Sequence, residues 1–489
     1  MAKTFQSLNP VTGDVIATYP ITSTREVAEA VTIAYDAFER WSATGYRNRR
    51  KVLHAYSKVI LKEIDNLSDL VTLETGKPHS DAKLEIALAA HHIAWAAQNA
   101  ENVLRTSHRT PGLLMANMSA TVERSPLGPV GVIGPWNYPV FTPIGSIAYA
   151  LAAGNTVVFK PSEYTPGVGI ALGQLFADVA GDEDIFQVIT GLGETGAALC
   201  ESGVKKVAFT GSTATAKKVA ALCASTLTPV IAECGGKDPV IIASDADLAA
   251  AAEATVWSAL SNAGQTCIGA ERVYVDEKVA DVFIEKVVEI AAKIHAGNPE
   301  SAQYGPATMP SQIKVIQSHV KDALKKGGVA AFGGLTSIQG DFVQPVILLD
   351  VPEDSLAVTD ETFGPTLVIN RVADMETAIA LSNASRYGLG ASVWSRRKGK
   401  GIASQLQCGM VAINSTISFA SVASVPFGGV KDSGYGRIHG PEGLLEFTFP
   451  RTIVRARFKL PLAITSFSRT EKTDRLIVKI LTMLRGRLS

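Results

Sequence analysis

The sequence predicts an α/β fold made of two lobes, each with a parallel sheet, and a cleft between the lobes. Three observations lead to this prediction. A chain of 489 residues is longer than one hydrophobic core usually supports, so at least two packed domains are expected. Short runs of β-branched residues, such as residues 130–133, alternate with helix-like segments along most of the chain. Many of these runs end in a polar or glycine-rich turn, and parallel strands gather such turns at one edge of a sheet.

The first hundred residues are expected to form an antiparallel pair of strands followed by long helices. A turn within residues 9–13, rich in Asn, Pro and Gly, would close the pair within residues 1–20. Ser23, with a glutamate three residues later, resembles the start of a helix. Further helices are expected over residues 47–74 and 80–104, and we interpret their charged residues as solvated faces.

The short apolar runs are predicted to be buried strands of two sheets. In the first lobe they are residues 130–133, 156–159, 186–189 and 206–209. In the second lobe they are residues 239–242, 272–275, 343–347, 366–369 and 410–414. No internal repeat and no linker rich in Pro, Ser and Gly separates them, so the lobes should pack against each other rather than be tethered.

Composition and charge exclude several classes of function. The chain is 46% hydrophobic and 19% charged, which is typical of a globular enzyme and not of a disordered or fibrous protein. Lys plus Arg and Asp plus Glu are both 46, so the formal charge is zero and no nucleic-acid partner is expected. The N-terminal residues lack the apolar stretch of a signal peptide, and no run of 18 apolar residues is uninterrupted. We therefore expect a cytoplasmic location.

The five cysteines indicate neither a disulfide framework nor a metal site. Cys200, Cys223, Cys234, Cys267 and Cys408 are scattered, form no C-x-x-C pair and have no histidines at ligand spacing. No metal is therefore expected.

The C-terminal tail is strongly basic. Residues 451–489 contain ten Lys or Arg residues and only two acids. Residues 474–485 have the pattern of a basic amphipathic helix, which is typical of weak peripheral membrane contact. The other interpretation, which we favour, is a terminal helix that packs on its own protein or on a second subunit.

One cysteine has surroundings that suit a reactive thiol. Cys267 lies between Gly264 and Gly269, just before the strand expected at 272–275. Small, flexible neighbours favour a thiol that faces a cleft, which makes Cys267 a candidate nucleophile. Free cysteine is also among the most buried residue types, so simple packing remains an alternative on this segment alone.

Several strand ends suit a bound dinucleotide. Residues 191–196 match G-x-G-x-x-G, although such matches are common in glycine-rich chains. Gly211-Ser212, where a buried strand opens into a helix, better suits a pyrophosphate. Lys160 and Glu163 end another strand. A carboxylate there would accept from ribose hydroxyls and repel a 2′-phosphate, which favours NAD over NADP. Each of these residues alone could equally be a solvated surface group.

Seven motifs, taken together, resemble the aldehyde dehydrogenase superfamily in order and approximate spacing. They are residues 136–139 (WNYP), 160–163 (KPSE), 209–213 (FTGST), 233–237 (ECGGK), 264–267 (GQTC), 361–365 (ETFGP) and 426–429 (PFGG). The resemblance covers nearly the whole chain except the C-terminal tail. It implies a Rossmann-type cofactor domain, an α/β catalytic domain and a small β oligomerisation element.

The resemblance also implies a domain division and a homo-oligomer. Residues 1–105 and 124–235 would form the dinucleotide-binding domain, and residues 236–432 the catalytic domain. Residues 106–123 and 433–489 would form the oligomerisation hairpin and strand with a C-terminal extension. Members of the superfamily are commonly dimers or tetramers, in which a hairpin, here residues 107–122, pairs with a late strand, here residues 447–457.

By the same resemblance, the reaction is the NAD(P)+-dependent oxidation of an aldehyde to the carboxylic acid. Cys267 is similar to the nucleophile that forms a thiohemiacetal and then a thioester. The side-chain amide of Asn137 and the backbone N–H of Cys267 would hold the oxyanion. Glu233 is similar to the base that activates the hydrolytic water, a task that needs a carboxyl of raised pKa.

The motifs further imply which residues contact the cofactor and the substrate. The residues expected at the cofactor, NAD with NADP as the alternative, are Trp136, Lys160, Ser162, Glu163, Gly193, Gly211, Ser212, Glu361 and Phe363. On this interpretation residues 191–196 lie near the adenine and are not a phosphate loop. The residues expected along the substrate tunnel are Tyr138, Phe141, Thr142, Thr266, Ile268, Phe419 and Phe427. Because no arginine is among them, we expect an uncharged aldehyde.

Two other functions remain open, and two positions depart from the family's pattern. A CoA-acylating enzyme would pass the thioester to CoA and would not need Glu233. A noncatalytic protein with the same fold would not need Cys267 or Asn137. Cys234 stands where the family often has leucine, and Ala216 where it often has glycine. Neither departure removes a catalytic group.

Overall fold

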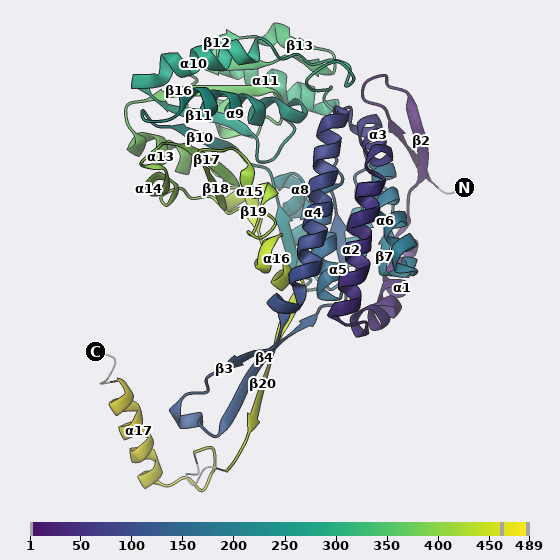
Figure 1. Cartoon of the computed structure of the whole chain (residues 1–489), viewed down its shortest axis with the longest axis vertical. Helices are drawn as coiled ribbons and strands as arrows, with labels where there is room; N and C mark the ends of the chain where they lie inside the picture. Colours follow the sequence, from purple (N-terminus) through teal and green to yellow (C-terminus); the bar gives the residue numbers. More distant parts are fainter. Residues whose placement is uncertain (1–2, 460–463, 486–489) are drawn as a thin grey trace.

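The computed structural model describes residues 3–459 and 464–485 of the chain. The body contains two large sheets with helices around them, and a narrow arm projects from the body (Figure 1). Within the described residues, no helix combines the length and the apolar character needed to cross a bilayer.

The first sheet has six strands in the order β19-β9-β8-β5-β6-β7. Its strands are β5 (Pro129–Ile133), β6 (Thr156–Lys160), β7 (Phe186–Val188), β8 (Lys206–Thr210), β9 (Val230–Glu233) and β19 (Gly434–Tyr435). All neighbours are parallel except β19, which runs antiparallel to β9. The four strands predicted in this lobe are therefore confirmed. β9, which places Glu233 at its carboxyl end, was not predicted as a strand.

Helices cover this sheet on its faces. They are α1 (Thr24–Ala43), α2 (Tyr46–Lys62), α3 (Ile64–Thr75), α4 (His79–Leu104), α5 (Phe141–Ala153), α6 (Pro166–Ala180), α7 (Gly193–Glu201) and α8 (Thr213–Ala224). Ser23 caps α1 in a reciprocal box with Glu26, as predicted. The single helix expected over residues 47–74 is two helices, because the backbone departs from helical geometry at Glu63.

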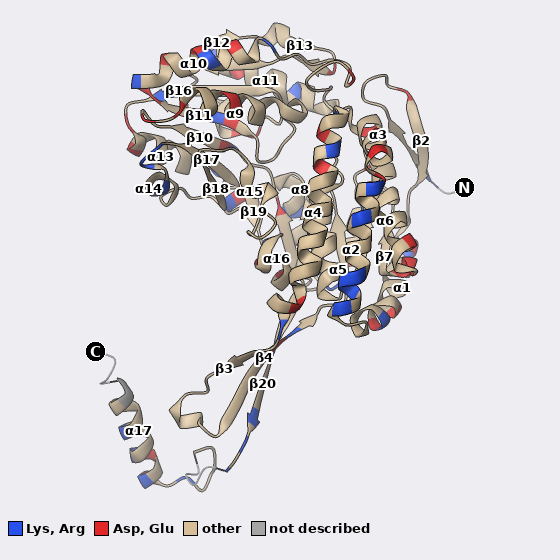
Figure 2. Cartoon of the chain, viewed as in Figure 1, with Lys and Arg blue, Asp and Glu red and all other residues tan. Residues whose placement is uncertain are grey.

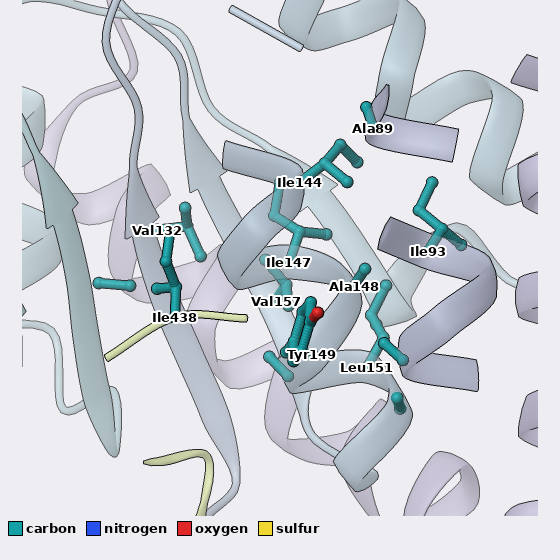
Figure 3. Close-up of a cluster of buried hydrophobic side chains, with 14 of the residues drawn as sticks. Ala89, Ile93, Val132, Ile144, Ile147, Ala148, Tyr149, Leu151, Val157 and Ile438 are labelled. Carbon is teal, nitrogen blue, oxygen red and sulfur yellow. The ribbon is translucent and has the colours of Figure 1, made fainter. Parts of the chain in front are cut away.

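Helix α5 joins the sheet to α4 in the main hydrophobic core. Figure 3 shows its side chains, including Ile144, Ile147 and Leu151, between those of α4 and the strands. All three are fully buried. Truncating a residue of this kind to alanine costs about 2–5 kcal/mol, so the core fixes the loop that leads from β5 into α5. That loop carries Asn137.

The second sheet has seven strands in the order β12-β15-β16-β11-β10-β17-β18. They are β10 (Asp238–Ile242), β11 (Ala270–Asp276), β12 (Val329–Phe332), β15 (Val346–Leu349), β16 (Thr366–Val372), β17 (Gly390–Trp394) and β18 (Met410–Ile413). Every neighbouring pair is parallel except β12 with β15. The strand expected at 343–347 is interrupted at Gln344–Pro345, and β17 was not predicted.

The remaining elements pack around this second sheet or form small additions. They are α9 (Leu248–Leu260), α10 (Glu277–Ala291), α11 (Ser311–Lys325), α12 (Leu356–Thr359), α13 (Met375–Asn383), α14 (Gly399–Ala403), α15 (Ser418–Ser421), α16 (Gly440–Glu446) and the pair β13 (Ile338–Gln339) with β14 (Phe342–Val343). The opening pair β1 (Thr4–Leu8) and β2 (Val15–Pro20) is antiparallel, as predicted.

The arm is a three-stranded antiparallel sheet with a helix at its end. β3 (Ser107–Arg109) and β20 (Thr448–Ala456) flank β4 (Met118–Pro126). The expected pairing of the hairpin with the late strand is confirmed within one chain. Between the second sheet and the arm, β19 and α16 return to the first sheet and to helices α4 and α5.

Helix α17 (Glu471–Arg485) follows the arm and stands apart from the body (Figure 1). Figure 2 shows the acidic and basic residues interspersed over the body, with basic residues along β20 and α17. The apolar side chains of Val478, Leu481 and Met483 are exposed. Packing of this helix on its own protein, part of the favoured interpretation, is therefore not found among the described residues.

Candidate active site

Cys267 lies on a short loop between a 3-10 turn (Ser261–Gly264) and strand β11. The loop needs glycine at 264, where φ is +70° and a Cβ atom would lie 2.1 Å from the carbonyl oxygen of Gly364. The cysteine is half-buried and lines two neighbouring cavities, one of about 330 Å³ and one of about 260 Å³. Cys267 therefore lies where the two cavities meet.

Asn137 is held beside this loop by hydrogen bonds on both sides. Its Nδ2 donates to the carbonyl of Gln265 at 2.9 Å, while its own carbonyl accepts from Asn262 Nδ2 at 3.0 Å. The Gln265 side chain in turn bonds the carbonyl of Asn262 and the backbone N–H of Thr308. An amide has two N–H donors, and among the described residues Asn137 Nδ2 has the one partner, so its second N–H can meet a ligand in the adjoining cavity.

A buried ion pair between Lys77 and Glu85 holds the backbone of Asn137. Lys77 Nζ donates to Glu85 Oε2 and to the carbonyl of Asn137, both at 2.7 Å. Glu85 Oε1 accepts from the backbone N–H groups of Val140 and Phe141. Both side chains of the pair are 0% exposed. The interpretation of the early helices' charges as solvated faces is therefore wrong for Glu85, whose buried carboxylate bonds the loop after β5. Lys77 precedes α4 and lies outside the helices that were expected.

Glu233 ends strand β9 and lines both cavities. Its carboxyl is buried, and within the described residues neither oxygen has a hydrogen-bond partner. Burial raises its pKa well above 4.5, and the positive charge of Arg437 opposes that rise. A buried carboxyl without a hydrogen-bond partner costs stability, and a raised pKa beside a cavity makes it a candidate functional group.

Glu361 faces the smaller cavity from the loop before β16. It accepts from the backbone N–H of Gly236 at 3.1 Å, and burial raises its pKa to about 8. Gly235 makes room for it, because a Cβ atom there would lie 2.2 Å from both carboxylate oxygens. Gly235 is thus required by the approach of the Glu361 carboxyl, whereas a Cβ atom at Gly236 would meet Asp238 and the carbonyl oxygen of Cys267.

A second buried ion pair fixes the Glu361 loop. Lys237 pairs with Glu271, and Glu271 accepts from the backbone N–H groups of Thr362 and Phe363. Burial lowers the pKa of Lys237, and the Glu271 carboxylate opposes this. Sequence reasoning missed this pair. Lys237 was quoted as part of a motif, but nothing indicated what it held.

The smaller cavity combines the groups that a dinucleotide needs. Its lining includes Trp136, Gly211, Ser212, Glu361 and Phe363, five of the residues expected at the cofactor. Ser212 caps helix α8 by accepting from the backbone N–H of Thr215, so the positive helix end opens beside the cavity. Phe363 meets Trp136 edge-on at 5.7 Å. A helix end for phosphates and a carboxyl for ribose hydroxyls fit a nicotinamide dinucleotide.

The other expected cofactor residues gather at the end of β6, outside the lining of that cavity. Lys160 Nζ lies 3.8 Å from Glu163, and burial lowers the pKa of this lysine. Ser162 accepts from the backbone N–H of Tyr164. Gly193 begins α7, and a Cβ atom at Gly196 in the same helix would lie 3.6 Å from Lys160. The G-x-G-x-x-G segment therefore lies beside the Lys160 side chain.

The larger cavity is the apolar one. It is lined by all the residues expected along the tunnel except one, namely Tyr138, Phe141, Thr142, Thr266, Ile268 and Phe427. Phe419 is the exception, since it lies outside the lining, with its ring 6.4 Å from that of Phe427. Tyr138 and Thr266 share a hydrogen bond of 2.8 Å between their hydroxyls. Leu84, Leu88, Trp257 and Ile417 extend the lining, and no sequence pattern indicated them.

The Cys267 thiol is held in its protonated form by its surroundings. Burial raises its pKa, and the carboxyls of Glu361, Asp238 and Glu233 raise it further. A positive group beside the sulfur would reverse this effect. In the part of the chain that the structure describes, no group of three or more His, Cys, Asp and Glu side chains could hold a metal ion.

Comparison with known proteins agrees with this geometry. A model described as the aldehyde dehydrogenase family matches residues 1–453. Over 451 residues the chain is 36% identical to a glutarate-semialdehyde dehydrogenase of Pseudomonas putida, with 91% of this chain and 93% of that protein covered. Over 462 residues it is 35% identical to a 4,4'-diapolycopene aldehyde oxidase of a Methylomonas species, with 94% and 87% covered.

Solved structures agree in fold. An E. coli NADP dependent enzyme superimposes with a TM-score of 0.90 at 33% identity, covering 93% of this chain and 95% of that one. An NAD-dependent aldehyde dehydrogenase from Sinorhizobium meliloti gives 0.90 at 31% identity, with 95% and 93% covered. The chain belongs to the aldehyde dehydrogenase family.

Proposed function

We propose that this protein oxidises an aldehyde to the carboxylic acid through a thiohemiacetal and a thioester on Cys267. The observation that carries the proposal is the position of Cys267 between a cavity suited to a dinucleotide and an apolar tunnel. Glu233 lines both spaces. The reaction balances as aldehyde, NAD(P)+ and water giving acid, NAD(P)H and a proton.

The first step adds the Cys267 sulfur to the carbonyl carbon as the thiol loses its proton. The carbonyl oxygen gains negative charge, and the free N–H of the Asn137 amide and the backbone N–H of Cys267 stabilise it. Lys77 and Asn262 fix the Asn137 backbone, so its amide is oriented before the substrate arrives. A bound nicotinamide would supply a positive charge and the carbon that accepts the hydride.

Glu233 acts in the second half of the reaction, when water cleaves the thioester. Its carboxylate takes a proton from the attacking water, and the thiolate of Cys267 leaves. A raised pKa suits this base, because a carboxylate of ordinary pKa is too weak to remove a proton from water efficiently. This role supports transfer to water rather than to CoA.

The cofactor is NAD or NADP, and we propose a preference for NAD. The proposal rests on Glu163, whose carboxylate beside Lys160 would repel a 2′-phosphate. Comparing kcat/KM for the two cofactors in wild type and Glu163→Gln tests it. The ratio should favour NAD and fall in the variant. A wild type that prefers NADP overturns the preference and leaves the reaction intact.

An aldehyde panel with Cys267→Ala and Cys408→Ala tests the reaction itself. Both cysteines are half-buried, but Cys408 lies outside the two cavities, so it is a matched control. Cys267→Ala should abolish NAD(P)H formation and Cys408→Ala should retain it. Activity that survives in Cys267→Ala contradicts the proposal, as does a product that requires CoA.

We also propose that the chain forms a homo-oligomer. Within one chain, we propose domain boundaries near residues 105, 124, 235 and 432. Eight of the nine residues of β20 are exposed, including Ile453 and Val454, and an exposed edge strand with apolar residues favours association. Residues 434–446 would then belong with the cofactor domain, because β19 and α16 pack there. Light scattering should give a mass above that of one chain, and Val454→Asp should lower it. A monomeric wild type contradicts the oligomer.

For the C-terminal helix we propose weak contact with an anionic membrane surface. Among the described elements α17 has no extensive contact with the body, and Lys472, Arg475 and Lys479 are exposed beside its apolar residues. Anionic vesicles should sediment the full chain at low salt, and Leu476→Asp should reduce this. Equal sedimentation with neutral vesicles, or none with anionic ones, contradicts the proposal.

A further inference from the structure

The lining of the substrate tunnel limits which aldehydes can enter. We infer that this enzyme takes long, uncharged, apolar aldehydes and rejects aldehydes that carry a terminal carboxylate. The inference rests on the proposed function and names the substrate class of the same site. It also separates this chain from the relative named as a glutarate-semialdehyde dehydrogenase.

Among the residues that line the tunnel, none is a lysine or an arginine. Three are acids, namely Asp81, Glu85 and Glu233, and most others are aliphatic, aromatic or small. A carboxylate that leaves water for such a space loses its hydration and finds no cation in the lining to pair with. An apolar chain instead gains from leaving water.

The nearest buried cation is not available to a substrate. Lys77 already donates to Glu85 and to the carbonyl of Asn137. Its Nζ also lies 4.2 Å from the centre of the Tyr138 ring, and Tyr138 belongs to the tunnel wall. Lys77 itself is not in the lining, and its ammonium group is already occupied by these contacts. The guanidinium of Arg437, near Glu233, donates hydrogen bonds to the carbonyls of Gly429 and Gly436. Arg437 is not in the tunnel lining.

The single histidine of the lining does not supply a positive charge either. His439 is buried among the rings of His92, Phe141 and Phe427, and burial lowers its pKa well below 6.5. A neutral imidazole cannot pair with a carboxylate as a cation does. Neither the buried cations nor His439 therefore offers a positive partner to a substrate carboxylate.

The rim of the tunnel is apolar and open to solvent. Leu84 on α4 is 48% exposed and Trp257 on α9 is 46% exposed, and both line the tunnel. Large apolar side chains at a cavity mouth can cover the part of a long chain that the cavity does not enclose. Asp81 also lines the tunnel, and burial raises its pKa. A chain can therefore extend from Cys267 past the rim without meeting a cation.

A matched set of substrates tests the inference. The set comprises octanal, its ω-carboxy analogue and the methyl ester of that analogue, each assayed for kcat/KM with wild type. We expect octanal and the ester to exceed the carboxylate by roughly 100-fold or more, because only the carboxylate brings an unpaired charge into the tunnel. A carboxylate within about 3-fold of octanal would overturn the inference.

The rim is tested by chain length. Leu84→Ala should reduce kcat/KM increasingly from butanal to dodecanal. Leu61→Ala is the matched control, because Leu61 is 46% exposed on α2 and lies outside the tunnel. A loss that is independent of chain length, or equal in both variants, contradicts the role of the rim.

A cation introduced at the mouth tests the charge argument in the opposite direction. Ser421→Lys, at an exposed position of the lining, should raise kcat/KM for the carboxylate by roughly 5- to 10-fold. Ser225→Lys places the same charge on the end of α8 and should leave kcat/KM for the carboxylate unchanged.

Failure of the inference can be told from failure of the proposed function. An absence of NAD(P)H with every aldehyde would refute the proposed function, whereas activity that does not discriminate against the carboxylate would refute the inference alone.

Discussion

Glu233 shows how burial of one side chain prepares a base. Its carboxyl has no partner among the described residues, and burial raises its pKa well above 4.5. The folded protein therefore holds a proton that the unfolded chain releases. This contribution to stability is fully present below the unfolded pKa and is lost as pH rises through the folded pKa.

The titration of Glu233 has two measurable consequences, one in the comparison of Glu233→Gln with wild type and one in wild type alone. Glutamine is neutral at every pH, so the variant should exceed wild type in free energy of unfolding by a margin that grows as pH rises above 4.5. In wild type the rate of thioester hydrolysis should rise with pH over the same range, because the base is the carboxylate. Urea unfolding and single-turnover assays from pH 5 to 9 check both. A margin that is constant with pH would contradict the buried titration.

The Lys77–Glu85 pair should matter both for stability and for the position of Asn137. Lys77→Met leaves the Glu85 carboxylate buried without its cation, which should lower the free energy of unfolding by about 3–5 kcal/mol. The double variant with Glu85→Gln removes the unpaired charge and should recover part of that loss. Urea unfolding measures both. Lys83→Met, which breaks the exposed pair with Asp65, is the control and should have no measurable effect. A double variant no more stable than Lys77→Met would contradict the account.

At the scale of elements, the loop from β9 to β10 leaves room for the Glu361 carboxyl. Gly235 has no side chain, so Glu361 can approach the loop and bond the N–H of Gly236. Gly264 has the same function in the Cys267 loop, where the backbone of Gly364 passes close by. The site is thus assembled from close approaches between the loops before β10, β11 and β16.

Alanine at position 235 should displace the Glu361 carboxyl. A Cβ atom 2.2 Å from both of its oxygens cannot be accommodated, so we expect KM for NAD(P) to rise about 10-fold or more if Glu361 holds the ribose. Gly401→Ala in α14 is the control, since a Cβ atom there meets nothing within 4 Å. Steady-state kinetics decide the outcome, and an unchanged KM in Gly235→Ala would contradict the role of Glu361.

For the whole molecule, the sequence predicted the parallel sheets better than it predicted the environment of helical charges. Continuous β-branched runs such as those of β5, β6 and β10 are buried on both faces, and that pattern is readable from one sequence. β17 contains small and polar residues between its apolar ones, so its run was not distinctive. Which charges on α4 face the interior depends on packing against the loop after β5, which no helical period reveals.

The candidate site was likewise predicted only in part from the sequence. The family resemblance predicted a common site for Cys267, Glu233, Asn137 and Glu361, and all four line the smaller cavity. The supporting pairs Lys77–Glu85 and Lys237–Glu271 hold loops that are distant in sequence, at Asn137 and at Thr362, so their function became visible only in the fold. The tunnel rim at Leu84 and Trp257 lies on helices whose apolar positions resemble ordinary core residues.

The central claim is that Cys267 carries the acyl group between oxidation and hydrolysis. Glu233→Gln should still oxidise octanal but should release the acid slowly, so about one equivalent of NAD(P)H per subunit should form in a rapid phase. Mass spectrometry of the digested, quenched protein should then find the acyl group on the peptide that contains Cys267. A protein without an adduct, or with the adduct on Cys234 instead, would contradict the account.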